Sequence, residues 1–217
     1  MGDIPEDRWL VVSNPDGSEL QLVEPLGEKA DKFEVSWSPS QQVVGTFSEG
    51  SDGGRQEVFP IGQQGENFSS FIAPGYGFTS QYLPQGERVL YSVYDPNADG
   101  RPQLYVADGR SSSFGASTQR VGLATWPDRC AASGGSLYCG VVRDLPPLAG
   151  VYPDLADGLP EDLWRVDLAT GQRERVGSLP SGVNAERIFT SPDGTAVYVV
   201  DRTTGRLYTV PVEPSQP

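Results

Sequence analysis

The sequence predicts an all-β fold, and three observations lead to this prediction. Short runs in which apolar and polar residues alternate occur throughout the chain, bounded by Gly, Pro, Asp and Asn, as in strands joined by turns. Almost no window keeps apolar residues at the i, i+3, i+4 spacing of a helix. The runs recur about every 45 residues with about four strands per unit, a period typical of propeller blades. We therefore expect a single β-propeller domain over residues 1–217.

The strand runs divide the chain into successive units. Two strands are expected in a partial blade at 8–24, and further blades at about 33–73, 76–125, 127–177 and 184–213, the last with three strands. The total is about four to five four-stranded blades. Strands from the two termini can share a blade, which removes sheet edges. This number of strands leaves two alternatives. In the first, the ring closes with a redundant strand or remains incomplete. In the second, which we favour, the chain is part of a larger propeller and pairs with another chain.

One segment carries a specific resemblance. The stretch FTSPDGTAVYVVDRTTGRLYTVPV (189–212) has Ser-Pro-Asp-Gly before a strand and then Asp-Arg-x-x-Gly-Arg-Leu-Tyr. It resembles the WD-like repeats of TolB-type bacterial β-propellers, and weaker copies stand at 37–47, 82–95 and 162–176. The similarity covers nearly the whole chain. It implies the fold and says little about activity.

Composition excludes several classes of function. The net charge is −13 with a pI near 4.3, so neither nucleic acid nor an anionic lipid surface is an expected partner. The chain contains no His, which excludes Ser-His-Asp hydrolases, His general bases and His-ligated zinc. No apolar stretch has the length of a membrane span, and the first residues do not resemble a signal peptide.

The two cysteines flank a predicted hairpin. In CAASGGSLYC (130–139) the central Gly-Gly favours a two-residue turn, and counting outward pairs Cys130 with Cys139. This position is a non-hydrogen-bonded pair, at which Cα atoms approach to about 4.5 Å, within the range of a disulfide. The alternative is two reduced core cysteines. A disulfide predicts an oxidising compartment, the periplasm or cell surface, in agreement with the TolB-type resemblance.

The loops between the second and third strands of each unit are expected to form a binding face. Three of them are rich in Asp or Glu, namely 48–54, 95–100 and 143–162, although acidic turns are also common for backbone reasons. The longest, RDLPPLAGVYPDLADGLPED (143–162, called the insertion below), is the candidate for docking a protein partner. The alternative is a loop that only covers a blade edge. Its candidate contacts are Leu148, Tyr152, Leu155 and Leu159.

The segment 95–100 (called the acidic turn below) begins like a calcium loop. Asp95, Asn97 and Asp99 alternate before Gly100, with the carbonyl of Arg101 and the side chain of Gln103 at the next positions. An EF-hand is excluded, because Val106 stands where its bidentate Glu belongs. The stretch also resembles the calcium hairpins of integrin-type propellers, but Gln103 replaces their last Asp. An ordinary Asx-type turn is favoured over calcium, and no other cofactor is expected.

We therefore expect a non-catalytic extracytoplasmic scaffold that binds a protein through its acidic loop face. The alternative is a calcium-stabilised, carbohydrate-binding surface domain, and the least favoured is a propeller glycosidase or lyase, for which no carboxylate pair stands out. The four tryptophans are expected mostly between blades rather than on a sugar platform, with Trp126 the best candidate for an exposed one.

Overall fold

The computed structural model describes residues 8–212, in which the regular structure is β-sheet apart from three short 3₁₀ helices, η2 (Gly27–Lys32), η3 (Pro127–Arg129) and η4 (Pro153–Ala156). The prediction of an all-β fold is confirmed. The strands form five antiparallel sheets, and the order of strands within each sheet follows the order in the chain. Each sheet is therefore a meander, the arrangement of a propeller blade.

The bounds of the strands define the five sheets. The first sheet contains β1 (Trp9–Val12) and β2 (Gln21–Pro25); the second contains β3 (Phe33–Val35), β4 (Val43–Ser51), β5 (Arg55–Gly62) and β6 (Phe71–Pro74). The third contains β7 (Tyr76–Tyr82), β8 (Arg88–Tyr94), β9 (Pro102–Asp108) and β10 (Gln119–Arg120). The fourth contains β11 (Cys130–Ser133), β12 (Ser136–Val142), β13 (Glu161–Asp167) and β14 (Arg173–Ser178); the fifth contains β15 (Ala185–Thr190), β16 (Ala196–Asp201) and β17 (Leu207–Pro211).

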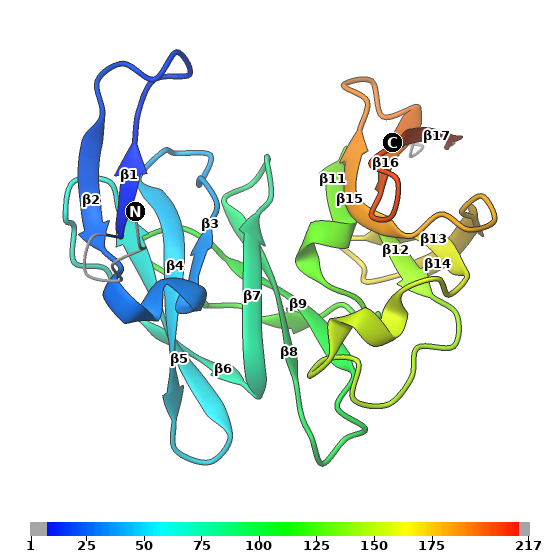
Figure 1. Cartoon of the computed structure of the whole chain (residues 1–217), viewed down its shortest axis with the longest axis horizontal. Coiled ribbons are helices and arrows are strands. Elements are labelled where there is room, and N and C mark those ends of the chain that lie inside the picture. The colour runs from blue at the N-terminus through cyan, green and yellow to red at the C-terminus, as the bar shows by residue number, and fades with distance from the viewer. Residues whose placement is uncertain (1–7, 213–217) are drawn as a thin grey trace, which may run out of the picture.

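The sheets follow one another along an arc (Figure 1). The first sheet lies at one end and the fifth at the other, and no strand of one is hydrogen-bonded to the other within residues 8–212. The described part of the chain therefore forms an open propeller-type arc. No helix within it is long and apolar enough to cross a membrane.

The core lies between successive sheets, so the inner strands are buried on both faces. In β8, Val89 and Tyr91 pack towards the second sheet, whereas Leu90 packs towards the fourth. In β12, Leu137 faces the third sheet and Tyr138 faces the fifth. Because side chains alternate across a strand, a strand covered on both faces buries consecutive positions, and most of these are apolar in β8 and β12. The third and fourth sheets therefore each pack against a neighbouring sheet on both of their faces.

The hairpin of β11 and β12 has the predicted register. Cys130 is opposite Cys139 and Ser133 is opposite Ser136, and the sulfurs form a disulfide with a Cα–Cα distance of 4.2 Å. Gly134 and Gly135 have φ values of 56° and 80°, the left-handed conformations that a two-residue hairpin turn requires. The predicted disulfide is confirmed, and it lies in the core between the third and fourth sheets.

Two expectations about tryptophan are wrong. Trp126 is buried, and the guanidinium carbon of Arg129 lies 4.6 Å from its ring centroid. Trp9 and Trp37 are instead 42% and 45% exposed. Within residues 8–212 the first sheet has two strands and lies at the end of the arc (Figure 1). Trp9, on its first strand, is exposed. The exposure of Trp9 and the burial of Trp126 depend on what other segments cover them, which their local sequence does not encode.

Candidate binding face

The acidic turn is the connection between β8 and β9. The side chain of Asp95 accepts a hydrogen bond from the backbone N–H of Asn97 at 2.9 Å, and its carbonyl accepts the N–H of Ala98 and of Gly100. Asp99 is left-handed, with φ 65°. These contacts define an Asx-type turn, which accounts for the residues at these positions through their own backbone chemistry.

Three oxygens of the proposed calcium set, one each from Asp95, Asp99 and Gln103, have protein partners. One carboxylate oxygen of Asp95 is occupied by the turn, and Asp99 forms an ion pair with Arg101 at 3.1 Å. The side-chain oxygen of Gln103 accepts the hydroxyl of Tyr105 at 3.1 Å. No three His, Cys, Asp or Glu residues between 8 and 212 are grouped as metal ligands. Calcium binding by the mixed oxygen set remains a hypothesis for titration.

The insertion packs directly against the acidic turn. The N–H of Leu148 donates to the carbonyl of Asp99 at 2.7 Å, and the N–H of Gly150 donates to that of Gly100 at 2.8 Å. The Nε of Arg101 donates to the carbonyl of Leu145 at 2.7 Å. A Cβ at position 150 would lie 2.5 Å from the Cβ of Tyr94, so this close approach requires glycine. Two segments singled out separately in the sequence thus form one surface.

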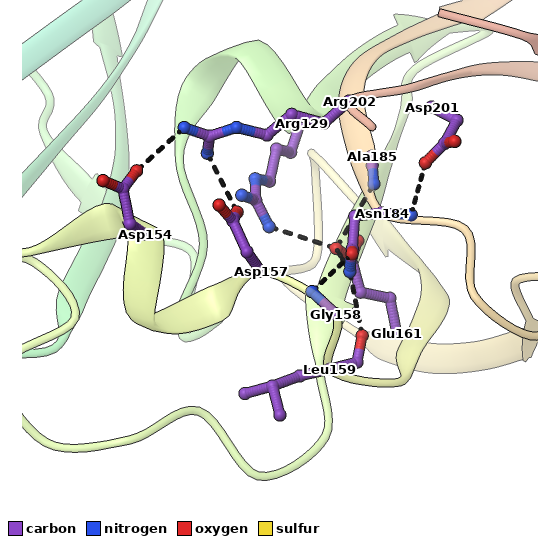
Figure 2. Close-up of polar contacts among 10 residues, drawn as sticks. All are labelled: Arg129, Asp154, Asp157, Gly158, Leu159, Glu161, Asn184, Ala185, Asp201 and Arg202. Atoms are coloured by element: carbon purple, nitrogen blue, oxygen red, sulfur yellow. Dashed lines mark hydrogen bonds and ion pairs between the residues drawn. The ribbon is translucent and has the colours of Figure 1, made fainter. Parts of the chain in front are cut away.

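The other end of the insertion is attached to the fifth sheet (Figure 2). Arg202 forms ion pairs with Asp154 at 3.0 Å and Asp157 at 3.3 Å. The side chain of Asn184 accepts the N–H of Gly158 at 2.6 Å and donates to the carbonyl of Leu159 at 2.9 Å. Short hydrogen bonds to the backbone restrict the loop more than exposed ion pairs do.

A buried ion pair lies beneath this attachment. The side chains of Arg129 and Glu161 are 4% and 0% exposed, and they meet at 3.1 Å (Figure 2). The same oxygen of Glu161 also accepts hydrogen bonds from the Asn184 side chain and the Ala185 N–H, both at 3.2 Å. The second oxygen, Oε2, has no hydrogen-bond partner within residues 8–212. Burial raises the pKa of Glu161, and Arg129 opposes this shift.

The insertion also has a small apolar core of its own. Leu145, Ala149 and Ala156 pack on Trp126 and Val142. Of the four candidate contact residues, Leu159 packs against this core. The other three are exposed: Leu148 at 43%, Tyr152 at 61% and Leu155 at 44%. An inner side that is packed and an outer side that is apolar and exposed make the insertion a structured surface, in contrast to a loose loop.

Two further carboxylates have strongly shifted pKa values. Hydrogen bonds from Arg175 and Arg143 lower the pKa of Asp162, the second residue of β13, to about 2. Burial and repulsion by Asp128 raise the pKa of Glu34 in β3 to about 7. Glu34 lies on β3 of the second sheet and Asp128 on η3, so the two carboxylates come together only in the folded arc.

Sequence reasoning missed the residues that hold this face together. Arg129, Glu161 and Asn184 look like ordinary polar residues near strand ends, and no spacing connects them. The only signal in the sequence for this cluster is the position of Glu161, the first residue of strand β13.

Comparison with known proteins supports the fold. No family model matches the sequence, and no significant match occurs among the curated proteins. Among solved structures, the chain is similar to TolB from Acinetobacter baumannii, with 16% sequence identity and a TM-score of 0.57. The alignment covers 95% of this chain and 49% of the TolB chain. It is also similar to a putative TolB from Agrobacterium tumefaciens, with 18% sequence identity and a TM-score of 0.50. The alignment covers 91% of this chain and 62% of that protein. A third is an oligogalacturonate lyase in complex with manganese, with 12% identity, a TM-score of 0.52, and 94% and 60% covered.

These similarities define the structural class of the chain. The chain has an all-β, propeller-type fold similar to that of TolB proteins. It spans about half the length of the Acinetobacter protein, at 49%. At these identities the likeness concerns the fold alone and carries no activity over to this chain.

Proposed function

We propose that this chain is a non-catalytic, extracytoplasmic binding or assembly module that docks a protein partner through the insertion. The observation that carries the proposal is the attachment of the insertion at both ends, with Leu148, Tyr152 and Leu155 left exposed between them. A loop already held in one conformation loses little entropy on binding. Tyr152 in particular is of a residue type enriched among the side chains that dominate binding energy at interfaces.

The acidic surroundings define the kind of partner. Asp144, Asp154 and Asp157 on the insertion and Asp99 on the acidic turn are exposed. Arg202 and Arg101 pair with three of these four carboxylates, so the negative field comes mainly from the chain as a whole. The chain carries a net charge of −13. The partner is therefore a protein with a basic rim around an apolar patch, recruited faster at low ionic strength. The disulfide supports a location in the periplasm or at the cell surface.

Site-specific photocrosslinking in cells tests this role. A photoreactive amino acid is placed at position 152, and at position 207 as the control, because Leu207 is equally exposed at 62% but lies on β17. We expect one discrete crosslinked protein from position 152, lost when Leu148→Asp is added, and none from position 207. No adduct at position 152, or the same adducts from both positions, contradicts the proposal.

The calcium-stabilised, carbohydrate-binding role is the second candidate, and its calcium part has a direct test. Calcium would have to compete with the ion pair of Asp99 and Arg101 and with the hydrogen bond accepted by Gln103. Calorimetric titration with calcium chloride should give no heat above that of Asp95→Ala. Heat that appears in the wild type and disappears in this variant would establish a calcium site.

Completion of the ring by another chain is a separate part of the proposal. It is supported by the uncovered apolar face of the first sheet, on which Trp9, Val11 and Leu22 are exposed. Light scattering of the purified chain measures its mass directly. A concentration-dependent dimer that Val11→Glu abolishes would support pairing of chains through this face, and a monomer at all concentrations would contradict self-pairing.

A further inference from the structure

A second candidate site lies beside the acidic turn, in a hollow that the insertion does not line. The hollow is formed by the turn between β4 and β5, the connection from β6 to β7, the end of β8 and the start of β9. Its volume is about 750 Å³, within the range of small-molecule sites. The side chains that matter are Arg55, Tyr76, Tyr94, Asp95, Asn97 and Gln103.

Two tyrosines give the hollow an aromatic wall. Tyr76 and Tyr94 are opposite each other on β7 and β8, and their rings stack with centroids 6.0 Å apart at 29°. Tyr94 is partly buried, whereas Tyr76 is 42% exposed. A large exposed aromatic ring supported by a second ring provides a flat, rigid apolar surface.

Glycine makes room for this wall. Gly54 has φ +69°, and a Cβ there would lie 3.0 Å from the hydroxyl of Tyr76. Gly77 has φ +60°, and a Cβ there would lie 2.4 Å from the ring of Tyr94. Both positions combine a left-handed backbone with a close contact to a ring, so only glycine is compatible with the observed arrangement.

Polar groups at the edge of the rings are available for a ligand. The second carboxylate oxygen of Asp95 and the side-chain amide of Asn97 have no hydrogen-bond partner among the described residues. The same holds for the side-chain NH₂ of Gln103, whose oxygen is used by Tyr105. Arg55 uses only its Nε, which donates to the carbonyl of Asp52 at 3.0 Å. The hollow therefore presents both hydrogen-bond donors and acceptors beside the aromatic surface.

The charge of the hollow selects among classes of ligand. Its ionisable side chains at neutral pH are one arginine and one aspartate, so neither an anion nor a cation is favoured by net charge. A sugar ring presents an apolar C–H face and a rim of hydroxyl groups that donate and accept hydrogen bonds. We propose that this hollow binds an uncharged saccharide, with the sugar ring on Tyr76 and its hydroxyls on Asp95, Asn97 and Gln103.

The proposal rests on the carbohydrate-binding candidate, and it is independent of protein docking by the insertion. It requires no calcium, because Asp95 and Asn97 contact the sugar through hydrogen bonds. The acidic turn would then have a functional use for the same side chains that suggested a metal loop.

Calorimetric titration of the full chain with maltohexaose, cellohexaose and N-acetylchitohexaose tests the proposal. We expect at least one of the three to bind. Tyr76→Ala should weaken that binding at least about tenfold, whereas Tyr76→Phe, which keeps the ring, should stay within about twofold. The matched control is Tyr152→Ala, an exposed aromatic on the insertion, which should bind the sugar like the wild type.

Asn97→Ala provides a second variant at an exposed turn position, where unfolding is not a concern. It should lower affinity for the same sugar without changing the thermal midpoint. Failure of all three sugars to bind, or binding that survives Tyr76→Ala, overturns the proposal. Sugar binding lost in Tyr152→Ala and kept in Tyr76→Ala would also overturn it and would place the site on the insertion. Failure of protein docking alone would leave sugar binding intact.

Discussion

Replacing Arg129 with methionine removes the cation that faces Glu161 beneath the insertion. Methionine keeps much of the apolar contact with Trp126 and leaves the Glu161 carboxylate, which is 0% exposed, without a counter-charge. Breaking a buried pair in this way costs about 3–5 kcal/mol. For a chain of this size, with an m-value of about 3 kcal/mol/M, the urea midpoint should fall by about 1–2 M.

The loss should depend on pH with a definite sign. Burial already raises the pKa of Glu161 above its ordinary value of 4.5, and removal of Arg129 raises it further. A carboxyl whose pKa is higher in the folded state takes up a proton on folding. The variant should therefore be least stable near pH 8 and should recover progressively as the pH is lowered towards 5. Arg129→Met combined with Glu161→Gln should remove most of this pH dependence.

Urea unfolding followed by tryptophan fluorescence and circular dichroism measures both effects. The matched control is Arg165→Met, which breaks the partly exposed pair with Glu174 and should cost no more than about 1 kcal/mol. A loss below about 1 kcal/mol for Arg129→Met at pH 8, or a loss that is the same at pH 5 and pH 8, would refute the reasoning about a desolvated charge.

Three further predictions concern the disulfide and two carboxylates. Cys130→Ala with Cys139→Ala should cost about 2–3 kcal/mol, because the bridge closes a short loop; a urea midpoint that is unchanged by reductant would contradict this. Glu34→Gln should be more stable than the wild type at pH 8 by about 1 kcal/mol. The pKa of Glu34 is raised to about 7, so the wild type loses stability as the pH rises from about 5 to 7. Identical pH profiles of stability for the variant and the wild type would count against this prediction. Asp162→Asn should lower the free energy of unfolding by about 1–2 kcal/mol at pH 7. This difference should vanish as the pH falls through about 2, because the Asp162 carboxylate, whose pKa is lowered to about 2, stabilises the fold only while it is ionised. Denaturant titrations at pH 7 and near pH 2 measure the difference.

The blade pattern could be predicted because it is local. The apolar run of β8 and the turn residues of 95–100 lie within a few positions of one another, and together they specify a strand and its reversal. Register in the Cys130–Cys139 hairpin followed from counting outward from a two-residue turn. Such features need only the backbone geometry of neighbouring residues.

The exposure of side chains on the arc could not be predicted in the same way. Trp126 was expected outside and is buried, because the insertion folds over it; Trp9 was expected between blades and is exposed, because the arc ends there. In both cases the local sequence is that of an ordinary strand end. What covers the residue comes from a different part of the chain.

The sequence by itself therefore determined the class of fold, the positions of the turns, the disulfide and the two segments worth testing for binding. Only the tertiary structure decided that the acidic turn and the insertion touch, that Arg129 and Glu161 meet in the interior, and that Tyr76 and Asp95 share a hollow. The physical reason is that each of these contacts joins different strands or loops. No residue pattern within one segment records which distant side chain will be packed against it.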